Sequence, residues 1–173
     1  MQVRPIFLPV HFSQAIISTM ASGEYEELLN MGVLSEEEGV SDETRHILAE
    51  KDFTEVVTIA EETLLVKQGT KPDALFFTID GKFHAISHAN PEAPNRLLGR
   101  IGVGQFIGEV CLVDPKSKAS ASVKAFPRSM VLKMKPEAFG ELCETHPKAA
   151  NEFLLAVARQ LGKRLKEANE RVL

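Results

Sequence analysis

The pattern of hydrophobic and polar positions divides the chain into a helical beginning, a long middle of short strands and a helical end. In the middle part, short apolar and β-branched runs alternate with turn residues such as glycine, proline and aspartate. Eight short strands at close, regular spacing predict a mainly β fold with flanking helices, an antiparallel barrel or jelly roll (double-stranded β-helix). The expected strands are residues 53–59, 63–66, 75–79, 83–87, 97–101, 105–107, 119–126 and 130–134.

Turn residues between these strands indicate where the chain reverses direction. Three dipeptides, Gln68-Gly69, Asp80-Gly81 and Pro127-Arg128, are expected to close hairpins. The segments that precede the strands have helical features instead. Residues 24–30 predict a first short helix, and Ser41 is expected to cap a second helix that runs to about Lys51.

The C-terminal part predicts two helices, over 136–145 and over 147–173, and each begins with a proline. In the second helix, apolar residues follow one another at alternating intervals of four and three positions. We expect this stripe to form a homodimer through a two-helix seam, with flanking charges such as Arg159 and Lys163 as its solvated rims. Packing of the same stripe on the chain's own strands is the alternative. The stripe contains Leu154, Ala158, Leu161, Leu165, Ala168 and Val172.

These patterns give three segments. Residues 1–23 lack a clear period and end at a Ser-Gly pair, which indicates an N-terminal extension. Residues 24–146 form the β domain with its flanking helices, and residues 147–173 form the dimerisation helix.

Composition narrows the functional classes. With 44% hydrophobic residues in 173, the chain is able to build an ordinary core, and no run approaches the ~18 apolar residues of a membrane-spanning helix. The net charge of −4 provides no broad positive field, which argues against nonspecific nucleic-acid binding. The two cysteines form neither a disulfide framework nor a metal pair, and prolines interrupt the apolar start of the chain, so we expect a cytoplasmic protein.

The most informative stretch runs from Ile101 to Val123. Its glycines, Gly102, Gly104 and Gly108, permit close approach of the backbone to a ligand, and a helical turn starting at Gly108 directs N–H groups toward an anion. The stretch therefore predicts a pocket for a phosphate. The alternative is that a barrel needs glycine at these corners whether or not a ligand binds.

The order of these features resembles the cyclic nucleotide-binding domain family, which includes the ligand domains of the catabolite activator protein and of the regulatory subunit of cyclic-AMP-dependent protein kinase. The resemblance extends from about residue 28 to about residue 170. Its most specific part is the phosphate-binding cassette, here residues 108–123. Gly108-Glu109 match the start of that cassette, Val110-Cys111-Leu112 its apolar helical turn, and Ser120-Ala121-Ser122-Val123 its end.

The resemblance implies roles for these residues. Glu109 would accept from the ribose 2′-hydroxyl of cyclic AMP or cyclic GMP, the N–H groups of Val110 and Cys111 would face the cyclic phosphate, Ser120 would donate to it, and Ser122 would lie near the base. A capping function at the first turn of its helix is a second role for Glu109. The ligand-binding residues implied are Gly108, Glu109, Val110, Cys111, Lys118, Ser120, Ala121 and Ser122.

One position departs from the family pattern, because Ala119 stands where the cassette arginine is expected. Lys116 and Lys118 are close in sequence, but shifting the register to use Lys118 destroys the match at its C-terminal end, and lysine lacks the bidentate guanidinium. Loss of such a partner for a desolvated phosphate costs about 2–5 kcal/mol. We therefore predict weak or altered cyclic nucleotide binding, with a dimerisation or interaction scaffold that binds no nucleotide as the alternative.

Other functional classes find little support in the sequence. No nucleophile and base stand in a catalytic pattern, so an enzyme is not expected. No helix-turn-helix follows the long helix, so DNA binding is not expected either. His84 and His88 share a strand face near Glu92, but no third histidine lies on a matching strand, and we expect no metal site.

Overall fold

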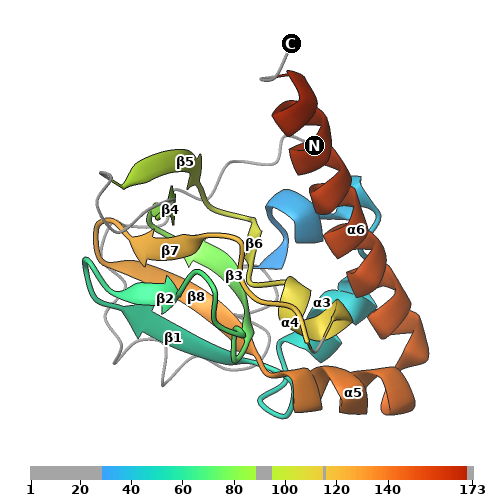
Figure 1. Cartoon of the computed structure of the whole chain (residues 1–173). Helices are drawn as coiled ribbons and strands as arrows, with labels where there is room; N and C mark the ends of the chain where they lie inside the picture. Colours follow the sequence, from blue (N-terminus) through green and yellow to red (C-terminus); the bar gives the residue numbers. More distant parts are fainter. Residues whose placement is uncertain (1–28, 89–94, 115, 171–173) are drawn as a thin grey trace, which may run out of the picture.

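A computed structural model describes residues 29–88, 95–114 and 116–170. Within them, two four-stranded antiparallel sheets lie beside a set of helices (Figure 1). The strands are β1 (Glu55–Ile59), β2 (Leu64–Val66), β3 (Leu75–Asp80), β4 (Phe83–Ser87), β5 (Arg96–Ile101), β6 (Phe106–Ile107), β7 (Ser122–Ala125) and β8 (Ser129–Met134). The helical elements are the 3-10 turns η1 (Gly32–Leu34) and η2 (Glu36–Glu38) and the helices α3 (Asp42–Leu48), α4 (Val110–Val113), α5 (Pro136–Thr145) and α6 (Pro147–Glu170).

The strand order confirms the jelly-roll prediction. One sheet has the order β1-β8-β3-β6 and the other β2-β7-β4-β5, so consecutive strands belong to different sheets except for β4 and β5. The two sheets face each other and, in the part of the chain that is described, do not join into one closed barrel. All eight expected strands are present, with ends that differ by a few residues from the expected bounds.

The hairpin prediction at Gln68-Gly69, Asp80-Gly81 and Pro127-Arg128 is wrong. Each dipeptide connects strands of different sheets, so the flanking strands are not paired with each other. Gly69 and Gly81 do occupy the left-handed region, with φ of 78° and 94°. The prediction of tight turns at these two glycines is therefore confirmed. A tight turn also serves to cross from one sheet to the other, and the sequence does not distinguish this use from a hairpin.

The core has two parts that meet at β3, whose residues are buried on both faces. Leu75, Phe77 and Ile79 pack toward the helices, while Phe76 faces the space between the sheets. On the helical side, the Phe106 ring lies 5.5 Å from that of Phe77. The cluster between the sheets contains Val66, Ala74, Phe76, Phe83, Ile101, Ile107, Ala119, Val123, Ala125 and Val131.

The N-terminal helical elements differ partly from expectation. The helix expected to follow Ser41 is present as α3, which ends at Leu48, and its cap is as expected because Ser41 Oγ accepts from the Thr44 N–H at 3.3 Å. The turns η1 and η2 were not expected from the sequence. Residues 1–23 and most of the expected helix 24–30 lie outside the described residues.

Helix α6 runs beside both sheets in Figure 1, and α4 and β6 lie on the side that faces it. Its buried face packs on the helical part of the core, with the Phe153 ring 5.2 Å from that of Phe106. No described helix has the length and apolar character needed to cross a membrane. The buried face of α6 consists of Ala149, Ala150, Phe153, Ala156, Val157 and Gln160.

The apolar stripe expected to form a dimer seam lies on a different face of α6. Leu154 is half-buried, Leu161 is 37% exposed and Leu165 is 64% exposed. Ala158 and Ala168 are exposed as well, and Val172 lies outside the described residues. Helix α6 therefore packs on its own chain with its buried face and not with this stripe. The dimer seam stays a prediction.

A carboxylate joins α6 to the N-terminus of α3. Glu152 Oε2 accepts from the Ser41 N–H at 2.9 Å and from the hydroxyls of Ser41 and Thr44, each at 2.7 Å. Burial acts to raise the pKa of the Glu152 carboxyl, but the hydrogen bonds from Thr44 and Ser41 outweigh it and lower the pKa below 4.5. The ionised carboxylate therefore stabilises the fold above that pH.

We expect Glu152→Gln to lower the melting temperature at neutral pH. Because folding lowers the pKa of Glu152, its contribution is lost as the pH falls through the lowered value, and the difference from the unmodified chain should shrink in acid. Thermal unfolding across the acidic range measures this, with the exposed carboxyl of Glu141 on α5, changed to Gln, as the matched control. An equal difference at neutral and strongly acidic pH would contradict the assignment.

A second contact joins η1 to the loop between β5 and β6. Gly104 has φ of 75°, and a Cβ atom there would lie 2.8 Å from the Gly32 Cα. The Val33 N–H donates to the Gly104 carbonyl at 3.0 Å. Two backbones meet at this point, and neither has room for a side chain.

We expect Gly104→Ala to lower the free energy of unfolding by about 1–3 kcal/mol, because alanine is strained at positive φ and meets the backbone of Gly32. Denaturant titration measures the change. The matched control is Gly102→Ala two residues earlier, where an added Cβ meets no atom within 4 Å, and its effect should stay within about 0.5 kcal/mol. Equal effects of the two substitutions would refute a contact-specific role for Gly104.

Candidate ligand-binding site

The start of α4 is shaped by the backbone at Gly108. This residue has φ of 77°, and a Cβ atom there would lie 2.8 Å from the Ala74 carbonyl oxygen. The first hydrogen bond of the turn runs from the Cys111 N–H to Gly108 O at 3.1 Å, so the N–H groups of Glu109 and Val110 precede it. Contacts within the protein thus require glycine at positions 104 and 108. This agrees with the alternative that the fold needs glycine at these corners whether or not a ligand binds.

Beside α4 lies a cavity of 1280 Å³ that is bounded by the β2-β7-β4-β5 sheet, the start of α4, η1, η2 and α6. This volume exceeds the roughly 300–1,000 Å³ of ordinary small-molecule pockets. Five of the residues implied by the resemblance lie on its wall. They are Gly108, Glu109, Val110, Ser120 and Ala121.

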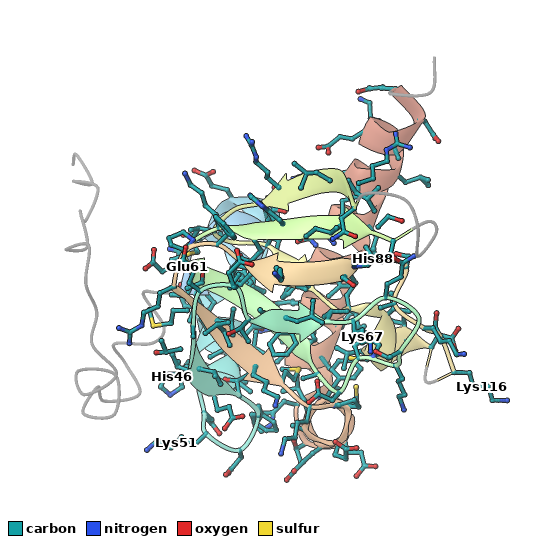
Figure 2. The ribbon with its side chains drawn as sticks, turned by 60° about the vertical axis from the view of Figure 1, so that its left-hand side comes forward. His46, Lys51, Glu61, Lys67, His88 and Lys116 are labelled. Carbon is teal, nitrogen blue, oxygen red and sulfur yellow. The ribbon has the colours of Figure 1, made fainter. Side chains whose placement is uncertain are left out.

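Three other residues of the implied set do not line this cavity. The Cys111 side chain is 2% exposed in the helical part of the core, where burial raises the pKa of its thiol to about 11. Ser122 is buried, and its Oγ accepts from the Gln68 N–H at 3.0 Å. Lys118 is exposed to solvent outside the cavity. Its neighbour Lys116 points away from the molecule at its outer edge (Figure 2).

Ala119 lies on the cavity wall at the position of the expected arginine. Its backbone is fixed on both sides by the loop between β2 and β3: the Ala119 N–H donates to Thr70 O at 2.9 Å, and the Gly69 N–H donates to Ala119 O at 2.8 Å. Ala119 as a whole residue is 9% exposed. A longer side chain at this position therefore has the cavity in front of it and a rigid backbone behind it.

Glu109 makes a contact that sequence reasoning did not anticipate. Its side chain is 10% exposed and accepts from Arg164 Nη1 at 3.1 Å. Arg164 Nη2 also donates to the Phe106 carbonyl at 2.6 Å. Glu109 makes no hydrogen bond that caps α4, so the expected capping role is wrong. The carboxylate binds the Arg164 guanidinium instead.

Helix α6 supplies further polar groups to this wall. Gln160 is 4% exposed, accepts from the Phe106 N–H at 2.7 Å and donates to Phe106 O at 3.0 Å. Lys163 is paired with Glu38, and Arg159 donates to the Glu38 carbonyl. The sequence prediction treated Arg159 and Lys163 as solvated rims of a dimer seam, whereas both contact η2. The sequence did contain one signal for the contact of α6 with Phe106, because Gln160 is a polar residue within an apolar helix face.

Of the residues weighed as a metal site, His84 and His88 are described. The His84 ring stacks on Phe126 with centroids 5.2 Å apart. Glu92 lies outside the described residues. Among the residues that are described, no three histidine, cysteine or carboxylate side chains are placed to hold one ion.

Comparison with known proteins agrees with this architecture. The Pycsar effector protein BcPycTIR of Burkholderia cepacia is 27% identical over 149 residues, which cover 86% of this chain and 46% of that protein. The cAMP-activated global transcriptional regulator CRP of Haemophilus influenzae is 28% identical over 111 residues, covering 64% of this chain and 47% of that protein. The chain thus spans less than half the length of each.

A solved structure has the same fold. The crystal structure of a cyclic nucleotide-binding domain from Methylobacillus flagellatus superimposes with a TM-score of 0.75 at 22% sequence identity, covering 88% of this chain and 84% of that one. The profile of the cyclic nucleotide-binding domain matches residues 56–146, which is more than half of the chain. This chain belongs to the cyclic nucleotide-binding domain family.

Proposed function

We propose that this chain is a cytoplasmic, non-catalytic sensing domain that binds a cyclic nucleotide, cyclic AMP or cyclic GMP, with weak affinity. The observation that carries the proposal is the open cavity with Glu109, Val110 and Ser120 on one wall. A carboxylate acceptor, backbone N–H groups and a hydroxyl are the groups that recognise a ribose hydroxyl and a phosphate. A relative whose name describes it as cAMP-activated adds support.

Ligand binding would act on α6 through the contacts at Phe106 and Glu109. A ligand held against residues 108–112 contacts Glu109, whose carboxylate binds Arg164, and lies next to Phe106, whose backbone binds Gln160 and Arg164. Any displacement of that turn changes the packing of α6, and occupancy of the cavity biases one arrangement of the helix over another. The response is therefore expected at α6 and at whatever contacts its exposed face.

Calorimetry with cyclic AMP and cyclic GMP tests the proposal, and a heat of binding that fits weak affinity is the expected result. Ala119→Arg should tighten binding, because a charge-assisted contact to a desolvated phosphate is worth about 2 kcal/mol or more, which is roughly 30-fold. Glu109→Gln should weaken it by removing the ionised acceptor. Lys118→Ala, outside the cavity, is the matched control. No heat and no thermal shift at millimolar ligand, in the unmodified chain and in Ala119→Arg, would refute the proposal.

The second candidate function is a scaffold that dimerises or binds another protein without a nucleotide. Two observations favour it: Ala119 removes the expected phosphate partner, and Arg164 already pairs with the Glu109 carboxylate. The volume of the cavity favours sensing instead, because a pocket that has lost its ligand is expected to fill with the protein's own side chains.

In either function we propose that the exposed stripe of α6 forms a homodimer. Leu161→Glu and Leu165→Glu place charges on the seam and should shift the sedimentation coefficient from that of a dimer to that of a monomer. Asn151→Glu, an exposed substitution near the start of α6, is the matched control and should leave the dimer intact. A monomeric unmodified chain at high concentration would exclude the seam.

A further inference from the structure

The cavity lacks a cation within the cassette, so the source of positive charge for an anionic ligand must be sought elsewhere on its wall. Of the described residues that line it, Arg100, Lys163 and Arg164 carry cationic side chains. Arg100 pairs with His84 on the neighbouring strand, next to the pair of Phe83 and Ile101. Because Phe83 and Ile101 face the core, strand alternation places the Arg100 side chain on the outer face of the sheet.

The two remaining cations both belong to α6, and they bind different groups. Lys163 is paired with Glu38 on η2. Arg164 reaches the cassette itself, since its guanidinium binds the Glu109 carboxylate and the Phe106 carbonyl. Glu109 is next in sequence to Val110, whose N–H group lies at the start of α4.

The bonding capacity of the pair leaves room for a ligand. A guanidinium has five N–H donors and a carboxylate has about four acceptor sites, whereas the structure uses two contacts of Arg164 and one of Glu109. A ribose hydroxyl is therefore able to donate to Glu109 while Arg164 remains paired. The free donors of Arg164 are then available to phosphate oxygens with the planar geometry that arginine offers.

We propose that Arg164 takes the place of the missing cassette arginine and supplies, from α6, the cation that binds the phosphate of the ligand. The inference rests on the proposed function. It makes α6 a part of the binding site rather than only a neighbour of it. The charge of the ligand then acts directly on the helix that carries the exposed apolar stripe.

The test measures binding of cyclic AMP and of adenosine, which lacks the phosphate, to the full chain by calorimetry. Arg164→Gln should weaken cyclic AMP binding by roughly 30-fold or more and leave adenosine binding within a few-fold, because only the charge-dependent part is lost. The cyclic AMP affinity of Arg164→Lys should lie between that of Arg164→Gln and that of the unmodified chain. Lys166→Gln, which removes an exposed cation of the same helix that does not line the cavity, is the matched control and should keep cyclic AMP affinity. Thermal unfolding of each variant checks that the fold is retained.

A second arm introduces Ala119→Arg into both backgrounds. Arginine at 119 should restore cyclic AMP binding to Arg164→Gln and add less affinity to the unmodified chain, since the two guanidinium groups serve the same phosphate. Unchanged cyclic AMP binding in Arg164→Gln, or equal losses for cyclic AMP and adenosine, would overturn the inference. So would binding by Ala119→Arg alone with none by the unmodified chain. Absence of binding in all of these proteins would refute the proposed function itself.

Discussion

The contact between Gln160 and the Phe106 backbone is the interaction on which the site depends. Strand β6 has only two residues and pairs with β3 along one edge, so its other edge presents a buried N–H and a buried carbonyl. Buried backbone groups of this kind need partners, and the amide of Gln160 satisfies both. In doing so it fixes the position of α6 relative to the residues that follow β6, which are the residues of the cassette.

Arg164 extends the same arrangement by one helical turn. A residue four positions after Gln160 lies on the same face of α6, and from there its guanidinium reaches both Phe106 and Glu109. Earlier on the same face of α6, the Phe153 ring packs against the Phe106 ring on the side of the core. One face of α6 thus changes from apolar to polar along its length, and the change occurs where the helix leaves the core and meets the cavity.

Much of this fold was predictable from sequence because local patterns are sufficient for it. Strand runs, the cap at Ser41 and the proline starts of α5 and α6 are properties of neighbouring residues, and each was found. The pairing of strands across the sheets was not predictable, since the turn at Gly81 looks the same whether it closes a hairpin or crosses between sheets. The cassette was recognised by the order of its residues. Its partners on α6 were missed because 55 residues separate Arg164 from Glu109.

The sheet order also determines when this protein can fold. Strand β8 lies between β1 and β3, and β7 lies between β2 and β4, so one of the two inner strands of each sheet comes from the last part of the β region. While the chain is being synthesised, β1 to β4 have unpaired edges until residues 122–134 have left the ribosome. Such edges are sites of nonspecific strand pairing. Glu62, just before β2, places a negative charge beside this unpaired edge before β7 arrives, and it forms an ion pair with Lys124 of β7 once the sheet is complete.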